Sequence, residues 1–392
     1  MVTGAVSLRW LALILVPAIV VLFWLTQQNK RSGKVQMRAE ARSVTTDQSN
    51  PGPSRLPPTN ASPPIVLVMK SPQQTNEPEP VKSIPKPEKP KPAAPPLVLT
   101  NAESNIYPRP AANIFEAQLA LSRKGISSGS IDGLMGPQTR DALRAFQLKE
   151  NLRATGDLDA ATKDHLLMNG PPLQTYQLTA GDLTRLQPLS PTWLGKSQQS
   201  ALEYETILEL VAEKSHAHPK LIRALNPTID WTNVVAGANV RLPDASYPEA
   251  AAKAAFIEIR LADRVLEVFG AETNLLAHFP CSIAQNVAKR PVGELHVEVI
   301  APNPNYTFKP EIFPESAEAR QIKTKLVLPP GPNNPVGVAW IGLDKPGYGI
   351  HGTPNPEQVG RTESHGCFRL ANWNAEYLLK MVSIGMPVRV DE

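Results

Sequence analysis

A cysteine and two histidines lie close together near the C-terminal end of the 392-residue chain. His351 belongs to residues 350–353, and His365 and Cys367 belong to residues 364–370. A thiol attacks a carbonyl carbon as its thiolate, and its ordinary pKa of about 8.5 means that a nearby imidazole must accept the proton. We therefore expect Cys367 to be an acyl-accepting nucleophile and one of the two histidines to be its base.

The spacing suggests different parts for the two histidines. His365 is two residues from Cys367, so the backbone N–H groups of His365, Gly366 and Cys367 could form a turn aimed at one carbonyl oxygen. His351 can reach the thiol only through the fold. The alternative is that both histidines have a structural role beside a buried thiol. Such a role does not require H-G-T followed by S-H-G-C-x-R-L, so we interpret the region as a catalytic site.

These residues resemble the catalytic domain of the L,D-transpeptidases of the YkuD type. That family has H-G-T, a glycine-bearing spacer and then S-H-G-C-hydrophobe-R-[LM]-x-N, and the similarity places the domain at residues 255–392. It implies that Cys367 is the nucleophile, that His351 is the base and that the Gly352 carbonyl orients the imidazole.

The resemblance also implies an oxyanion loop and a substrate site around the thiol. His365 and Gly366 would shape the oxyanion loop. Arg369 would hold this loop and meet a substrate carboxylate, with Ser364 and Thr353 as further substrate-binding residues.

The implied reaction is acyl transfer on peptidoglycan stem peptides. Cys367 would attack the carbonyl of the L-centre of the third residue, expel the terminal D-amino acid and pass the acyl group to an amine of another stem. No metal or cofactor is implied. Two alternatives stay open: an L,D-carboxypeptidase that uses water as acceptor, and a non-catalytic protein that tethers the cell wall. Arg290 and Asn374, which replace the family's usual threonine and aspartate, leave the substrate preference open.

The second cysteine, Cys281, lies in the apolar residues 279–283, where a free cysteine behaves as a small hydrophobic side chain. We expect it to be neither catalytic nor paired with Cys367, because a disulfide would remove the nucleophile. Two cysteines also exclude a disulfide-stapled scaffold and a four-cysteine zinc site.

Alternating apolar and polar residues predict that the catalytic region is mostly β. Residues 256–268 predict a hairpin that turns at 262–264. Further strands are expected at residues 295–300, 336–341 and 388–390, and the sequence also predicts a helix over 375–382.

Residues 111–170 predict a small three-helix domain. The first helix is expected to end at Gly125, Thr139 to cap the second, and the third to follow Asp159. The run IDGLMGPQTRDALRAFQ resembles the three-helix peptidoglycan-binding domain, which implies peptidoglycan as a partner. A helical spacer without affinity for the wall remains the alternative.

Residues 171–247 predict an α+β segment with a first strand, helices at 208–214 and 221–226, and a closing strand near 237–243. The pieces L-x-x-L-N-P and G-x-x-V-x-L-P resemble a LysM module, but the stretch between the first strand and the first helix is too long for one. His216 and His218 have no third ligand nearby, so we expect them to face solvent rather than to bind a metal.

The N-terminal residues predict an anchor and a spacer. Residues 1–29 contain sixteen consecutive positions, 10–25, without a polar side chain, which favours a membrane anchor over a cleaved signal peptide. Residues 30–110 are rich in proline, which predicts an extended linker rather than an SH3-type ligand. The basic residues after the anchor favour a cytoplasmic body, but the implied substrate places the catalytic domain in the periplasm or cell wall.

Only this N-terminal part of the chain has a net positive charge. Residues 1–110 hold 13 Lys/Arg against 6 Asp/Glu, whereas residues 111–255 hold 14 against 15 and residues 256–392 hold 13 against 15. Binding to nucleic acid needs positive charge gathered on a folded face, so we expect no nucleic-acid partner. The sequence thus predicts a multidomain protein of the cell envelope.

Overall fold

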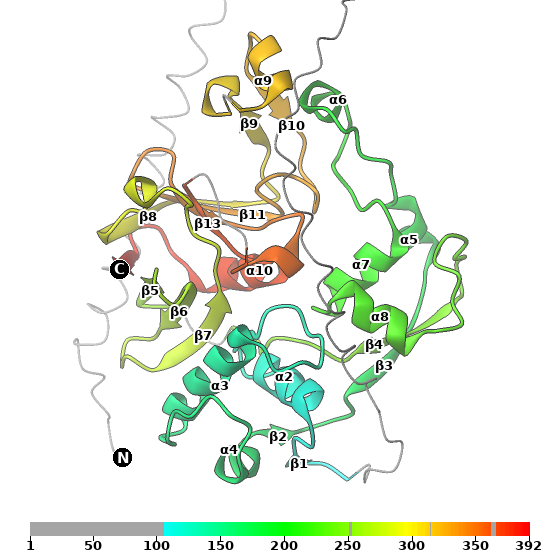
Figure 1. Ribbon diagram of the computed structural model, residues 1–392, viewed down its shortest axis with the longest axis vertical. Helices are drawn as coiled ribbons and strands as arrows, with labels where there is room; N and C mark the ends of the chain where they lie inside the picture. The colour runs from blue at the N-terminus through cyan, green and yellow to red at the C-terminus, as the bar shows by residue number, and fades with distance from the viewer. Residues whose placement is uncertain (1–105, 251–252, 314, 362–365) are drawn as a thin grey trace, which may run out of the picture. The chain divides into compact units, whose positions relative to one another are not determined.

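The computed structural model describes residues 106–250, 253–313, 315–361 and 366–392 (Figure 1). The predicted anchor, nearly all of the linker, and the site residues Ser364 and His365 lie outside these ranges. Within them, no helix combines the length and the apolar character that a membrane span needs.

The C-terminal region is built around a sheet of eight strands in the order β13-β12-β11-β8-β14-β5-β6-β7. The strands are β5 (Phe256–Arg260), β6 (Val265–Phe269), β7 (Leu275–Pro280), β8 (Gly293–Pro302), β11 (Ala339–Leu343), β12 (Gly349–His351), β13 (Phe368–Arg369) and β14 (Pro387–Asp391). Helix α10 (Asn372–Met381) contacts β8, β11 and β12 and buries Ala375 and Leu378 against the sheet. The prediction of a mostly β catalytic region is confirmed.

Two boundaries in this region differ from the prediction. The strand expected at 336–341 begins at Ala339, because Gly337 has a φ of 60° and turns the chain just before it. Helix α10 begins at Asn372, earlier than expected, and Ala371 at its N-cap provides no side-chain hydrogen bond. The usual polar cap that marks a helix start is therefore missing from the sequence.

The predicted three helices of the first domain are present. They are α2 (Ile114–Ser122), α3 (Pro137–Lys149) and α4 (Ala160–His165), and the short strands β1 (Arg109–Pro110) and β2 (Leu167–Met168) pair beside them. Asp159 caps α4 by accepting a hydrogen bond of 2.9 Å from the Thr162 N–H. The prediction for Thr139 was wrong, because Pro137 already starts α3 and the Thr139 side chain is buried 3.1 Å from Gln118 Nε2.

The next segment contains the predicted strands and helices. It consists of β3 (Leu173–Gln177), α5 (Ala180–Thr184), α6 (Trp193–Ser197), α7 (Ile207–Lys214), α8 (Pro219–Leu225) and β4 (Asn239–Pro243), with β3 and β4 antiparallel. Its relation to LysM modules stays a prediction. Its buried side chains form one apolar cluster with those of the three-helix domain, for example Val211 and Ile222 with Leu143 and Phe146.

The expectation that both histidines of this segment face solvent was wrong. The His216 ring stacks on Trp373 of α10 with a centroid distance of 5.3 Å, and burial lowers its pKa to about 3. His218 caps α8, because its Nδ1 accepts a hydrogen bond from the Lys220 N–H at 3.1 Å. Among the described residues, no group of three or more His, Cys, Asp or Glu side chains could hold a metal ion.

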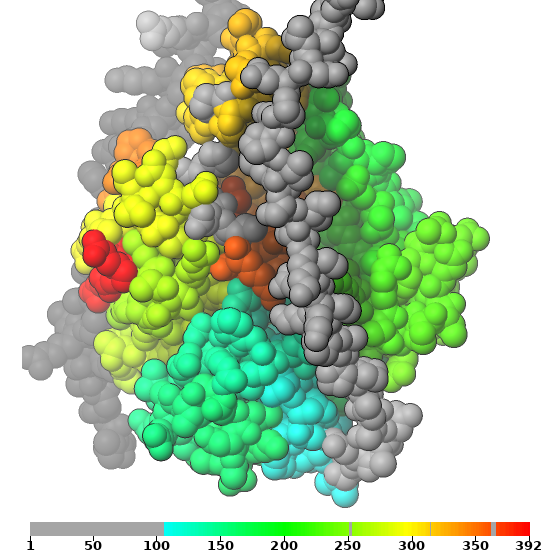
Figure 2. All heavy atoms as spheres, in the orientation of Figure 1, coloured from blue at the N-terminus to red at the C-terminus, as the bar shows by residue number. Residues whose placement is uncertain are grey.

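The unusually long stretch noted in the sequence forms an arm, residues 187–203, that reaches the catalytic region. Trp193 of α6 stacks on Phe308 with ring centroids 4.3 Å apart. Phe308 belongs to a projection made of β9 (Tyr306–Phe308), β10 (Leu326–Leu328) and α9 (Ala317–Gln321), drawn in gold at the top of Figure 2. Leu202 pairs through its backbone with Pro330 at 2.8 Å and with Asn333 at 2.9 Å. The arm therefore joins the two regions.

This junction predicts a sensitive glycine. Gly331 has a φ of 141°, and a Cβ there would collide with the backbone of Leu202. We expect Gly331→Ala to lower the free energy of unfolding by about 2 kcal/mol or more in urea denaturation. Gly237→Ala is the control: Gly237 also has a positive φ, of 88°, but open space around it, and should lose only about 1 kcal/mol. Equal losses would contradict the close contact at Leu202.

Candidate active site

Cys367 and His351 line the same cavity, which has a volume of about 960 Å³. Gly366 and Arg369 also line it, so these four members of the predicted thiol site are brought together, whereas Gly352 and Thr353 do not line the cavity. Aromatic side chains form much of the remaining wall: Trp193, Tyr306, Phe313 and Trp340.

Strand pairing explains why these residues meet although they are apart in sequence. Strands β12 and β13 are parallel neighbours, with Ile350 opposite Phe368 and His351 opposite Arg369. The Leu370 N–H donates a 2.8 Å hydrogen bond to the His351 carbonyl and continues the pairing. Cys367 directly precedes β13, so the sheet places the thiol segment beside the histidine strand.

His351 is held in one orientation. Its Nδ1 lies 2.6 Å from the Gly352 carbonyl oxygen, and Trp340 stacks on the ring with centroids 5.7 Å apart. An imidazole that donates through Nδ1 leaves Nε2 free of a proton. Burial lowers the pKa of His351 to about 4, although the Gly352 carbonyl acts in the opposite direction. The ring is therefore a neutral base at physiological pH.

The Cys367 thiol is also uncharged in the resting site. Burial raises its pKa above the ordinary range, while a hydrogen bond with the Gly349 backbone and the positive charge of Arg369 partly oppose this shift. Sγ lies 3.5 Å from the Gly347 carbonyl, to which the thiol donates. A neutral thiol and a neutral imidazole thus share the cavity, so the proton must move when sulfur attacks.

Arg369 contributes a positive charge to the cavity wall. Its guanidinium is half-buried near Cys367 and Tyr306, and burial lowers its pKa from the usual very high value. Arginine nevertheless stays protonated at neutral pH. The arrangement suits the binding of a carboxylate or the stabilisation of negative charge beside the sulfur.

Thr353 does not line this cavity. It is buried, its N–H donates to Asn372 Oδ1 at 3.0 Å, and its Oγ1 accepts from the Asn355 N–H at 3.3 Å. These bonds support the loop after β12. A direct substrate contact for Thr353, like the roles of Ser364 and His365, stays a prediction.

Several side chains at the site were missed from the sequence. Asn372 occupies the last position of the S-H-G-C motif, which was a usable signal, and its amide supports the His351 loop. Trp340 and Tyr306 had no local signal beyond their aromatic character. Trp193 could not be found, because it comes from the arm and reaches the cavity only through tertiary packing.

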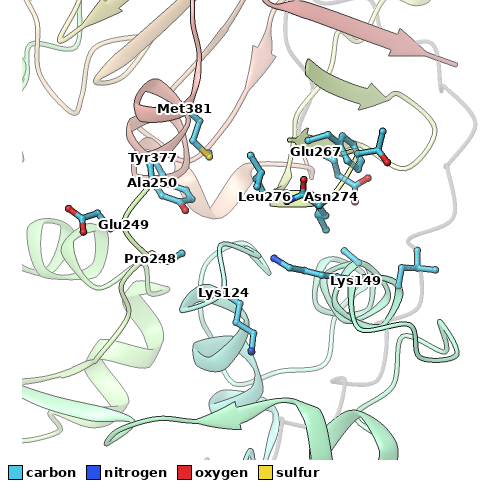
Figure 3. Close-up of a pocket in the computed structure, with 15 residues that line it drawn as sticks. Lys124, Lys149, Pro248, Glu249, Ala250, Glu267, Asn274, Leu276, Tyr377 and Met381 are labelled. Carbon is cyan, nitrogen blue, oxygen red and sulfur yellow. The ribbon is translucent and has the colours of Figure 1, made fainter. Parts of the chain in front are cut away.

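A second cavity of about 650 Å³ is distinct from the thiol site. Figure 3 shows Lys124 and Lys149 of the helical domain on one side, and Asn274, Leu276 and Tyr377 of the catalytic region on the other. None of the predicted catalytic residues lines it.

Comparisons with known proteins agree with the geometry of the thiol site. A family model described as "L,D-transpeptidase catalytic domain", of the YkuD type, matches residues 254–390, and another described as "Putative peptidoglycan binding domain" matches residues 110–166. The C-terminal region is thus a YkuD-type L,D-transpeptidase catalytic domain. A helical domain of the peptidoglycan-binding type precedes it.

Similar individual proteins carry the same description. "Putative L,D-transpeptidase YkuD" of Bacillus licheniformis is 25% identical over 47% of this chain and 93% of its own length. "Putative L,D-transpeptidase YqjB" of Bacillus subtilis is 34% identical over 26% of this chain and 52% of its own length. "Probable L,D-transpeptidase ErfK/SrfK" of Escherichia coli is 29% identical over 42% and 53%, respectively. The chain therefore spans about half the length of the last two.

The contrast between the two cysteines gives a prediction. Both are free thiols, but Cys281 is fully buried, and burial raises its pKa far above the ordinary range. We expect Cys281→Ala to retain most of the acylation by a carbapenem-like β-lactam, measured by intact-protein mass spectrometry, and Cys367→Ala to lose it. Loss of acylation in a Cys281→Ala variant with an unchanged circular dichroism spectrum would contradict this assignment.

Proposed function

We propose that this protein is a cysteine-dependent L,D-transpeptidase that acts on peptidoglycan stem peptides. The principal support is the His351 imidazole, held through Nδ1 by the Gly352 carbonyl at 2.6 Å and sharing a cavity with Cys367. The cavity also contains Arg369, a cation suited to an anionic substrate.

The first half of the reaction forms a thioester. The Cys367 proton passes to His351 Nε2 while sulfur attacks the carbonyl of the L-centre of the third stem residue. Backbone N–H groups around Gly366 stabilise the oxyanion, and the Gly352 carbonyl stabilises the imidazolium. Collapse of the tetrahedral intermediate breaks the peptide bond, and His351 returns the proton to the departing D-amino acid.

The second half transfers the acyl group to an amine. An amine of another stem attacks the thioester, His351 removes its extra proton, and collapse forms the new amide and releases the Cys367 thiol. Arg369 provides a positive charge for a substrate carboxylate. The proton balance closes over the cycle, and no atom changes its oxidation state.

The test of this function is mass spectrometry of muropeptides incubated with the protein. We expect cross-linked products and free D-amino acid when an acceptor amine is present, and neither with Cys367→Ala. Products that only lose the D-amino acid, with or without added amine, would instead identify a carboxypeptidase. No reaction and no β-lactam adduct would contradict an enzymatic role.

The supporting parts of the protein are consistent with action in the cell envelope. The helical domain provides a second contact with peptidoglycan in this proposal, and residues 10–25 anchor the chain in the cytoplasmic membrane with the catalytic domain outside. A reporter that is active only outside the cytoplasm should be active when fused after Lys34. Activity of a cytoplasmic reporter at the same position would contradict the proposed orientation.

The protonation of the site predicts an unusual pH profile. Because the pKa of His351 is lowered to about 4, its base form should persist as the pH falls from 7 to 5. We expect the rate constant for acylation of Cys367 to stay nearly constant over this range and to fall only near pH 4. Stopped-flow measurements that show a midpoint near 6.5, the ordinary imidazole value, would contradict this.

The two histidines should respond differently to replacement. His351→Ala removes the base, so acylation should fall about 100-fold or more at pH 7 and recover partly at alkaline pH, where the thiol ionises unaided. His365→Ala alters the oxyanion loop and should not recover. Alkaline rescue of His365→Ala but not of His351→Ala would reverse the two assignments.

A further inference from the structure

A carboxyl group that the proposed reaction does not use lies against the loop that supports His351. Glu213 belongs to α7, in the segment before the catalytic region, yet both its oxygens lie 3.1 Å from Asn372 Nδ2 of α10. The same amide nitrogen lies 3.1 Å from the Pro332 carbonyl. Glu213 therefore helps to fix the amide of Asn372 from outside the catalytic domain.

The other end of that amide holds the peptide group next to the base. Asn372 Oδ1 accepts from the Thr353 N–H at 3.0 Å and from the Val338 N–H at 3.3 Å. The Thr353 N–H and the Gly352 carbonyl belong to one peptide unit, which is planar and rigid. Fixing the N–H therefore fixes the carbonyl that lies 2.6 Å from His351 Nδ1.

We propose that Glu213 is a positioning residue for His351, acting through Asn372 and the Gly352–Thr353 peptide group. The segment of residues 171–247 then completes the active site, in addition to any contact with the wall. This inference rests on the proposed role of His351 as the base.

The surroundings of Glu213 show how it fills this role. Tyr204 OH donates to its Oε1 at 3.2 Å, and Glu209, Glu376 and Arg185 are the nearby charged groups. Burial raises the pKa of Glu213 to about 8, with repulsion from Glu209 and Glu376 in the same direction. At neutral pH the group is therefore mostly an uncharged acid, which glutamine imitates in shape and in its carbonyl acceptor.

Helix α7 is itself fastened to the catalytic region beside this contact. Asn333 Nδ2 donates to Glu209 Oε1 at 2.6 Å and to the Glu203 carbonyl at 2.9 Å. These two hydrogen bonds hold α7 and the residues just before it against the loop that contains Pro332. This attachment keeps Glu213 within reach of Asn372.

The experiment compares Glu213→Leu, Glu213→Asp and Glu213→Gln in the full chain. We measure the rate of Cys367 acylation by a carbapenem between pH 5 and 9.5, together with the thermal unfolding midpoint. Glu213→Leu should lower the rate at pH 7 at least tenfold, and Glu213→Gln should restore it to within about threefold. Alkaline pH should partly rescue Glu213→Leu, because a thiol that ionises unaided needs no oriented base.

Glu205→Gln is the matched control. Glu205 lies just before α7, is exposed, and undergoes the same change of side chain, from glutamate to glutamine, without a bond to Asn372. Its acylation rate should equal that of the unaltered protein. Glu213→Asp retains the acid but shortens its reach, so it tests the inference even if Glu213→Leu does not fold, and it should show the same alkaline rescue.

The outcomes separate this inference from the proposed function. Rates for folded Glu213→Leu or Glu213→Asp equal to that of the unaltered protein, with His351→Ala still impaired, would overturn the role of Glu213 alone. A loss in these variants that is the same at every pH would also overturn it, since that indicates general damage. Normal acylation of His351→Ala would overturn the proposed function itself.

Discussion

The catalytic arrangement depends on one peptide group, the one between Gly352 and Thr353. Its carbonyl orients His351, and its N–H is bound by Asn372. A Cβ at Gly352 would collide with Asn372 Oδ1, so only glycine permits the amide to approach this closely. The glycine of H-G-T therefore has a steric reason, and the threonine contributes its backbone to the same support.

Burial favours the uncharged form of both the thiol and the imidazole of this site. It raises the pKa of Cys367 and lowers that of His351, so the charged pair is disfavoured before substrate binds. Arg369 also opposes an imidazolium in the resting site. In the proposed reaction, negative charge on a bound carboxylate or on the oxyanion would offset the charge of the arginine when His351 takes up a proton. The proposed chemistry would thereby be coupled to the presence of substrate.

The sequence was informative where function depends on residues close together in the chain. The H-G-T and S-H-G-C motifs predicted that His351 and Cys367 meet, and the pairing of β12 with β13 brings the histidine strand beside the segment that follows Cys367. Alternation predicted the β5–β6 hairpin, although only β5 alternates in burial and β6 is buried on both faces. The prediction for Thr139 failed because Pro137 supplies a stronger helix start. His216 and Trp193 could not be placed, because their partners lie far away in sequence and are chosen by packing alone.

The candidate active site therefore includes residues from outside the catalytic domain. The matched family region begins at residue 254, but Trp193 of the arm forms part of the cavity wall and Glu213 contacts Asn372 behind the base. Both residues belong to a segment that shares its apolar core with the helical domain. Under the proposed role of Glu213, a change in the packing of that segment would reach the cavity through Trp193 and the His351 loop through Asn372. The residues before 254 contact the catalytic region directly at both places.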